Sequence, residues 1–295
     1  MSNYILSCCS TVDISHEHLK SRDISYACYS FFIDGKQYAD DLGQTISYEQ
    51  FYTMMSAGAD TKTSQINVDE FVKYFDSLLS TGKDLLHVAM SSGLSGTFNS
   101  ARIAAEELRD KYPNQKIYVV DSLAASSGYG LIIDKLADLR DGGMDIDSLY
   151  NWIEENKLNM HHWFFSTDLT FYVKGGRVSK VSGWFGTVLN ICPLLNVDVN
   201  GKLIPRQKIR GKRAVIQKIV EKMKEHAMFG KDYDGKCYIS HSACPDDANE
   251  VAELVKAAFP KIDGEVLINS IGTTIGSHSG PGTVALFFWG DKRVD

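Results

Sequence analysis

The first half of the chain repeats one unit: a short apolar segment, a polar loop and an amphipathic helix. The apolar segments span residues 4–9, 84–90 and 116–120, and helices are predicted at 67–80, 97–109 and 126–139. A strand that returns through a helix to a parallel neighbour makes a right-handed crossover, and repeated crossovers build a parallel sheet covered by helices. The sequence therefore predicts an α/β fold whose N-terminal domain, residues 1–159, contains a parallel sheet flanked by helices.

The second half has a different pattern. Strands are predicted at 161–166, 194–199, 202–206, 236–240, 266–271 and 284–289, with helices at 211–228 and 245–259. Asn200-Gly201 separates two of these strands, and this dipeptide favours a tight hairpin. We therefore expect a C-terminal α+β domain with a mixed or antiparallel sheet over residues 160–295. Because no low-complexity linker separates the halves, we expect them to pack closely and to bind a ligand at the domain junction.

The composition excludes several classes of protein. Of the 295 residues, 44% are hydrophobic and 23% are charged, which is typical of a globular chain. The net charge of -6 argues against a general nucleic-acid binder, which carries a basic surplus. No apolar run reaches the roughly 18 residues of a membrane span, and residues 1–10 lack the basic start of a signal peptide. The six cysteines form no C-x-x-C pair, and we expect reduced thiols and a cytoplasmic protein.

A loop rich in serine and glycine, Ser91–Thr97, follows the strand at 84–90. In parallel sheets, ligands bind where the strands end. Three roles are open for this loop. Ser95 is a candidate nucleophile, although no His/Asp pair accompanies it in the sequence. The loop could instead cap the helix that follows, or its hydroxyls and the free N–H groups of the helix N-terminus could bind an anion. The charge of a helix N-terminus favours the anion site.

Three further segments place polar or charged residues where they suit an anion. Thr63-Ser64-Gln65 puts hydroxyls at a predicted helix start. Arg177 follows the Gly175-Gly176 turn, and arginine pairs with carboxylates and phosphates through two hydrogen bonds. His278 lies in the glycine-rich stretch 276–282, for which we predict a loop rather than a helix or strand.

Several motif matches fail. Gly230-x-x-x-x-Gly235-Lys236-Cys237 lacks the Ser/Thr of a phosphate-binding P-loop and precedes a strand instead of following one. Gly280-x-Gly282 also precedes a strand, unlike a dinucleotide-binding turn. His161-His162 and His16-x-His18 have no Cys or carboxylate cluster at zinc spacing. We therefore expect neither a cofactor nor a metal.

Taken together, these segments resemble the DegV family of bacterial fatty-acid-binding proteins, along essentially the whole chain. The matching stretches are Thr63-Ser64-Gln65, Ser91–Ala101, Val120-Asp121-Ser122, Lys174–Ser179, Leu189–Leu195, Arg210–Arg213 and Ile275–Gly282. Each stretch is short, but so many in one order are highly specific. One departure follows the first strand, where Cys8-Cys9-Ser10-Thr11 replaces the family's Thr-Asp-Ser-Thr turn and its acidic residue.

The resemblance implies two packed domains that hold one long-chain fatty acid, with its tail buried and its carboxylate near the domain junction. The residues that it assigns to the ligand are Thr63, Ser95, Gly96, Ser122, Arg177 and His278. It also implies a partner, the ATP-binding subunit of a fatty-acid kinase, which makes an acyl-phosphate from the presented acid for phospholipid synthesis. The chain itself would then be a carrier and not an enzyme.

Two other functions are open. An acyl-transfer or hydrolytic enzyme would use Ser95 or His278, but no base with an orienting partner is recognisable. A lipid-sensing regulatory protein would bind another macromolecule. The basic stretch at 206–213 suits that role or the kinase partner, because such charges attract an acidic surface. The residues assigned to partner binding are Arg206, Arg210 and Arg213.

Overall fold

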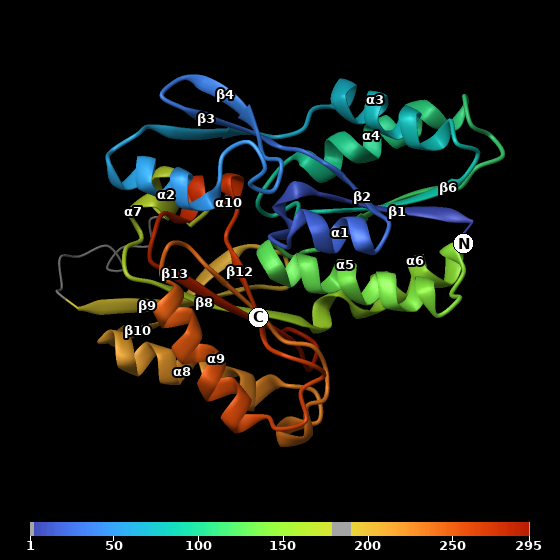
Figure 1. The fold of residues 1–295 in the computed structure, drawn as a ribbon. Coiled ribbons are helices and arrows are strands. Elements are labelled where there is room, and N and C mark those ends of the chain that lie inside the picture. The colour runs from blue at the N-terminus through green and yellow to red at the C-terminus, as the bar shows by residue number, and fades with distance from the viewer. Residues whose placement is uncertain (1–2, 179–189, 295) are drawn as a thin grey trace.

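The computed structural model of the protein describes residues 3–178 and 190–294. Its N-terminal sheet is fully parallel, in the order β2 (Ile24–Ala27), β1 (Tyr4–Cys9), β6 (Asp84–Ala89) and β7 (Ile117–Asp121). One face is covered by α3 (Val68–Leu79) and α4 (Thr97–Arg109), and the other by α1 (His16–Ser21), α5 (Ser126–Asp141) and α6 (Ile146–Asn156) (Figure 1). The parallel sheet with flanking helices confirms the predicted α/β fold.

Helix α3 illustrates how the sequence sets these elements. Asn67 and Glu70 form the predicted capping box, in which each side chain accepts a hydrogen bond from the other residue's backbone N–H. Phe71, Phe75 and Leu79 recur at four-residue spacing and are buried. Because residues four apart share one face of a helix, this face packs against the sheet.

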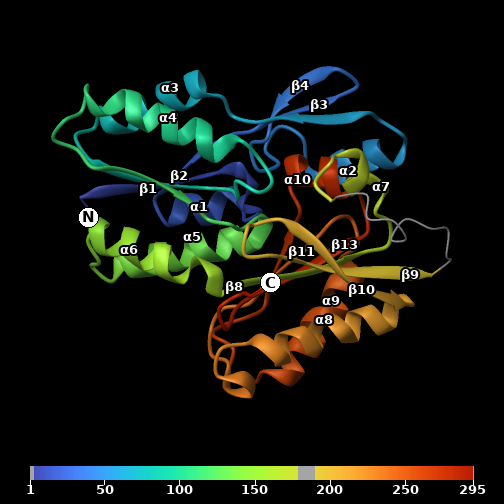
Figure 2. The ribbon, with the colours of Figure 1, turned by 180° about the vertical axis from the view of Figure 1, so that it is seen from behind.

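The second sheet has mixed strand directions, as predicted. Its order is β10 (Leu203–Arg210), β9 (Ile191–Val197), β8 (Met160–Ser166), β13 (Thr283–Trp289), β11 (Tyr238–His241) and β12 (Leu267–Ser270). Only β11 and β12 pair in parallel. Helices α8 (Lys212–His226) and α9 (Pro245–Ala258) lie on the outer face, and α5 lies between the two sheets (Figures 1 and 2). Leu203 pairs with Val197, so the predicted hairpin is also confirmed.

Side chains of β13 alternate between two hydrophobic layers. Ala285 and Phe287 belong to the core shared with α5, whereas Leu286 and Phe288 belong to the core beneath α8 and α9. This alternation follows from the two-residue period of a strand. The core on the inner face therefore joins the two halves of the chain, and the division into domains 1–159 and 160–295 stays a prediction.

A third, antiparallel sheet was not predicted from the sequence. It consists of β4 (Lys36–Ala39), β3 (Ser30–Ile33) and β5 (Thr61–Ser64), and the short helices α2 (Tyr48–Ser56), α7 (Thr170–Lys174) and α10 (Thr273–Ser279) lie beside it (Figure 1). Two predictions were wrong here. Thr63 lies in β5, where it pairs with Phe31, and not at a helix start. His278 lies in the last turn of α10 and not in a loop.

Tertiary contacts explain why α10 forms in a glycine-rich stretch. A side chain at Gly276 would place its Cβ 2.5 Å from the Tyr52 hydroxyl oxygen and 2.9 Å from the Phe51 ring. The hydroxyl of Tyr52 donates to the Ile271 carbonyl (2.9 Å), just before the helix. Glycine therefore allows α10 to pack closely on α2, which outweighs its low intrinsic preference for a helix.

Among the described residues, no helix combines the length and apolar character that crossing a bilayer requires. The remaining short elements are the 3-10 turns Ser10–Val12, Lys157–Asn159 and Gly230–Asp232. Ser179 and Leu189, which belong to the matching stretches of the sequence, lie outside the described residues.

Candidate functional site

A cavity of about 660 Å³ lies between the carboxyl edge of the N-terminal sheet, α10 and the inner face of the second sheet. Five of the six predicted ligand residues line it: Thr63, Ser95, Gly96, Arg177 and His278. The apolar part of its wall comes from Met90, Leu94, Ala125, Phe164, Val197, Leu203, Ile271, Ile275, Ala285 and Phe287. The cavity therefore combines a polar corner, formed by Thr63, Ser95, Arg177 and His278, with an apolar wall, which suits an amphipathic ligand.

Ser95 precedes α4 and has two roles in the structure. Its Oγ accepts a hydrogen bond from the backbone N–H of Thr97, the first residue of α4 (3.3 Å), although the N-cap position itself is Gly96. The same atom lies 3.3 Å from the hydroxyl of Tyr29 and 2.9 Å from that of Thr97, and it faces the cavity. Its hydrogen-bond partners among the described residues include no histidine. Ser95 therefore lacks the neighbouring general base that activates a serine nucleophile.

Thr63 and His278 form a close pair across β5 and α10. The Thr63 Oγ1 and His278 Nε2 atoms are 2.7 Å apart. The His278 Nδ1 atom is buried and has no hydrogen-bond partner among the described residues. Burial, and secondarily the charge of Arg177, lower the pKa of His278 to about 4. The imidazole is therefore neutral at pH 7, and it can act on an anion through hydrogen bonding but not through charge.

Arg177 supplies a permanent cation at the cavity. Its Nε donates to the Leu94 carbonyl (3.4 Å), and one terminal nitrogen donates to the Gly175 carbonyl. Partial burial lowers the pKa of its guanidinium, but an arginine stays protonated at neutral pH. Arg177 is an exposed residue that also lines the cavity, so its guanidinium is accessible both from solvent and from the cavity.

Gly96 and Ser122 differ in how they relate to the cavity. Gly96 lines the cavity, and a Cβ there would lie 2.6 Å from the Gln65 Oε1 atom, so any larger residue would displace the Gln65 side chain. Ser122 is fully buried, and its hydroxyl donates to the Ala124 carbonyl (3.3 Å). Ser122 does not line the cavity. The structure therefore does not support its predicted place at the ligand, because its hydroxyl turns back to its own loop.

Asp13 is a residue of this region that sequence reasoning missed. Its carboxylate accepts hydrogen bonds from the Gly272 N–H (2.9 Å), at the start of α10, and from the Ser126 hydroxyl (2.5 Å), at the start of α5. Burial raises the pKa of Asp13 to about 8. Asp13 therefore fixes two helices that line the cavity. Its position could have pointed to it, because Asp13 follows the first parallel strand and lies close to the Cys8–Thr11 turn, where the family's acidic residue is absent.

Cys9 occupies the position of that missing acid, and it has a histidine neighbour. Its Sγ lies 3.6 Å from the Nε2 of His87. Both residues are fully buried, and burial raises the pKa of Cys9 to about 12 and lowers that of His87 to about 3. Both are thus neutral at pH 7, so the pair lacks the thiolate of a reactive cysteine.

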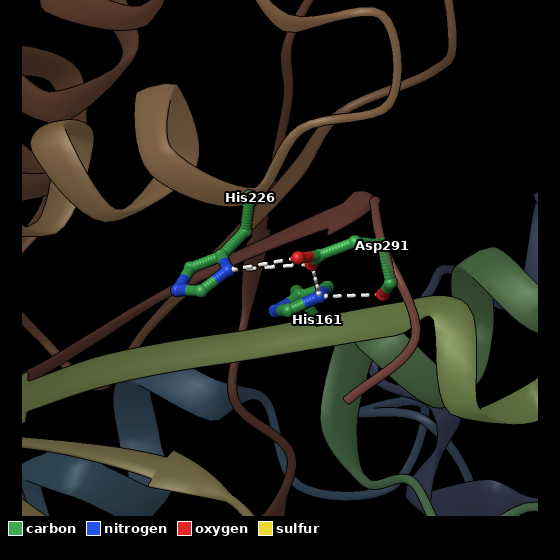
Figure 3. Close-up of side chains that lie close together, drawn as sticks. All are labelled: His161, His226 and Asp291. Atoms are coloured by element: carbon green, nitrogen blue, oxygen red, sulfur yellow. Dashed lines mark hydrogen bonds and ion pairs between the residues drawn. The ribbon is translucent and has the colours of Figure 1, made fainter. Parts of the chain in front are cut away.

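His161, His226 and Asp291 gather at the far side of the second sheet, with potential ligand atoms within 4.8 Å of one another (Figure 3). The His161 Nε2 donates to the Asp291 carbonyl (2.9 Å), so it carries a proton instead of a free lone pair. The two imidazoles stack with centroids 4.9 Å apart and planes 18° apart. An ion in the plane of one ring would lie off the plane of the other. This geometry is more consistent with hydrogen bonds that hold His161, His226 and Asp291 together than with a metal site.

The three arginines assigned to a partner lie along one edge of the second sheet. Arg206 is half-buried on β10, and its Nε donates to the Asn196 side-chain oxygen (2.8 Å). Arg210 ends β10 and Arg213 lies in the first turn of α8, and both are exposed. The role of this edge stays a prediction.

Comparison with known proteins finds similarity along the whole chain. The family model described as "uncharacterised protein, DegV family" matches residues 9–291. A DegV domain-containing protein of Clostridium perfringens is 34% identical over 293 residues, which cover 99% of each chain.

Two solved structures share the fold. A hypothetical protein from Thermotoga maritima, whose structure revealed a fatty-acid-binding function, is 26% identical, with a TM-score of 0.82 over 98% of this chain and 100% of that one. The fatty acid kinase B3 protein of Streptococcus pneumoniae, loaded with linoleic acid, is 21% identical, with a TM-score of 0.84 over 99% and 100%. With a family model across nearly its whole length and a 34% identical relative of the same extent, the chain belongs to the DegV family.

Proposed function

We propose that this protein binds one long-chain fatty acid, with the carboxylate at Thr63 and Ser95 and the tail in the cavity. The main observation behind the proposal is a cavity of about 660 Å³ that is lined both by the hydroxyl-bearing residues Thr63 and Ser95 and by a set of apolar side chains. The fatty acids named for the Thermotoga and Streptococcus proteins support this class of ligand. For the chain itself we propose no catalytic activity and no cofactor.

The pair of Thr63 and His278 explains how a hydroxyl would be aimed at the carboxylate. A neutral imidazole whose Nε2 carries the proton donates to the Thr63 oxygen. The Thr63 hydroxyl proton is then free to point at a ligand oxygen. His278 thus orients Thr63, while Arg177 supplies the positive charge that balances the carboxylate.

The tail provides most of the affinity. A saturated sixteen-carbon acid removes about fifteen CH₂ and CH₃ groups from water, at about 0.8 kcal/mol each, or roughly 12 kcal/mol in all. The loss of translational and rotational freedom and the ordering of side chains subtract several kcal/mol. The remainder corresponds to an affinity tighter than about 1 μM.

A second part of the proposal is that the chain presents this acid to a separate fatty-acid kinase in the cytoplasm, where the acyl-phosphate enters phospholipid synthesis. The kinase name of the Streptococcus protein supports this partner. Exposed Arg210 and Arg213 suit contact with an acidic protein surface, because opposite charges speed association. Six free cysteines, four of them buried, are consistent with a reducing compartment.

Thr63→Val and Ser95→Ala should each weaken fatty-acid binding by about tenfold or more, because each removes a hydrogen bond to a charged acceptor worth about 1.5–3 kcal/mol. The tail should still bind, so binding should weaken but persist. Displacement of a fluorescent fatty acid by palmitate measures the effect.

Ser77→Ala is the matched control, since Ser77 is exposed on α3 and its hydroxyl bonds only the Tyr74 carbonyl. Its affinity for palmitate should equal that of the wild type. If both cavity variants also keep the wild-type affinity, the carboxylate does not lie at Thr63 and Ser95.

A further inference from the structure

The inner face of the second sheet forms the floor of the cavity. Thr283, Ala285 and Phe287 of β13 line it, and Phe164 and His162 of β8 lie opposite Ala285 and Phe287 in register. The floor runs about 13 Å from Thr283 to Phe287, at about 3.3 Å per residue. Its Thr283 end is tied to α7 by a hydrogen bond to the Tyr172 hydroxyl (3.0 Å). The polar corner of the cavity, with Arg177 and His278, is therefore at that end.

The opposite end of the floor is closed by α5. A Cβ at Gly128 would lie 2.5 Å from the Phe287 ring and would overlap the His162 Nε2 atom. Helix and sheet are thus in direct contact at Gly128, and no acyl chain can pass between them. In the middle of the floor, Ala285 is the smallest side chain and leaves room above the sheet.

His162 closes the cavity without offering it a free polar group. Its Nδ1 donates to the Met160 carbonyl (3.1 Å), and its Nε2 accepts from the Ala125 N–H (3.3 Å). Complete burial holds its pKa well below the usual value, so the ring is neutral. Both nitrogens are therefore satisfied by backbone groups, and the remaining ring surface can contact a terminal methyl group.

We propose that His162 and Phe287, seated against Gly128, form a stop that sets the longest acyl chain the cavity accepts. Ala285 sets the free width of the path to that stop. This inference rests on the proposed fatty-acid function and deepens it by naming the residues that select chain length.

As the acyl chain of the tested acid becomes longer, the affinity of the wild-type protein should rise and then stop rising. We call the chain length at which this happens the break. Each methylene that enters the cavity should tighten binding by about fourfold. Once the terminal methyl reaches the stop, a further methylene should tighten binding no more or should weaken it. Competition between a fluorescent fatty acid and straight-chain saturated acids, lengthened one carbon at a time, locates the break.

Two variants should move the break in opposite directions. In His162→Ala it should shift to acids longer by about two to four carbons, because a ring of five heavy atoms leaves and the wall relaxes into part of the space. In Ala285→Leu it should shift to shorter acids, because the new side chain fills the path. Ala285→Leu also tests the stop if His162→Ala does not fold.

His161→Ala is the control, because His161 is the neighbour of His162 on β8 but points to the opposite face, where it stacks on Phe288. Its break should stay at the wild-type length. A break that neither cavity variant moves, or that His161→Ala moves as far as His162→Ala, would overturn the stop alone. A wild type that binds no acid of any length would overturn the proposed function and the stop with it.

Discussion

Replacing Arg293 with alanine is expected to lower the free energy of unfolding by about 3–5 kcal/mol, because three backbone carbonyls, two of them buried, lose a donor and a cavity opens. Arg293 is 5% exposed near the end of the chain. Its guanidinium donates to the carbonyls of Val197 (3.2 Å) and Asp198 (3.0 Å) in the β9–β10 turn, and to that of Leu123 (3.0 Å) after β7. One side chain thus joins both sheets.

Urea unfolding of lipid-free protein measures this change, since a bound ligand would add its own stabilisation. Lys292→Ala is the matched control, because Lys292 is the exposed neighbour of Arg293 and its removal should change the unfolding free energy by less than about 0.5 kcal/mol. Val197 lines the cavity, so Arg293→Ala should also retain less fatty acid. An unfolding free energy for Arg293→Ala equal to that of Lys292→Ala would show that the guanidinium does not hold the sheets together.

If the proposed kinase partner acts on the bound acid, Arg177→Ala should reduce acyl-phosphate formation by about a hundredfold or more, and fatty-acid binding by much less. Charge develops on the transferred phosphoryl group, and removing one well-placed donor at such a group costs about 10²–10³ in rate. The carboxylate would still be held by Thr63 and Ser95. Kinase turnover at saturating carrier, measured beside lipid affinity for the same variant, separates the two effects.

Arg177→Lys and Arg210→Glu are the informative comparisons. Lysine keeps the charge but loses the planar donor fork, so its turnover should fall between those of the wild type and Arg177→Ala. Arg210→Glu should raise the carrier concentration that the kinase needs and leave the saturated rate unchanged, because an exposed charge acts mainly on association. Full turnover by Arg177→Ala would remove Arg177 from the phosphoryl-transfer step.

The predictions from sequence succeeded where local pattern and global fold agree. The apolar face of α3, with its capping box, needed no tertiary information. The hairpin could be predicted from Asn200-Gly201, because its turn needs a positive φ, which glycine adopts most easily. Gly201 indeed has φ = 70°. These features are local, so a single sequence carries them in full.

Elements held by distant contacts were missed. Helix α10 lacks an apolar repeat, and it depends on Asp13, about 260 residues earlier, which accepts the Gly272 N–H. The small sheet that carries Thr63 is built from four-residue strands with a weak alternation. The family resemblance placed Ser122 at the ligand, but the hydroxyl of Ser122 donates to the Ala124 carbonyl of its own loop. Such details depend on packing, which the pattern of one sequence does not contain.

The most direct test of the central claim is mass spectrometry of an organic extract from the purified protein. We expect about one long-chain fatty acid per chain in the wild type, because the cavity has one polar corner and one closed end. The Thr63→Val, Ser95→Ala double variant should retain much less. An extract of folded wild-type protein that contains no stoichiometric fatty acid, from cells that make such acids, would contradict the proposed function.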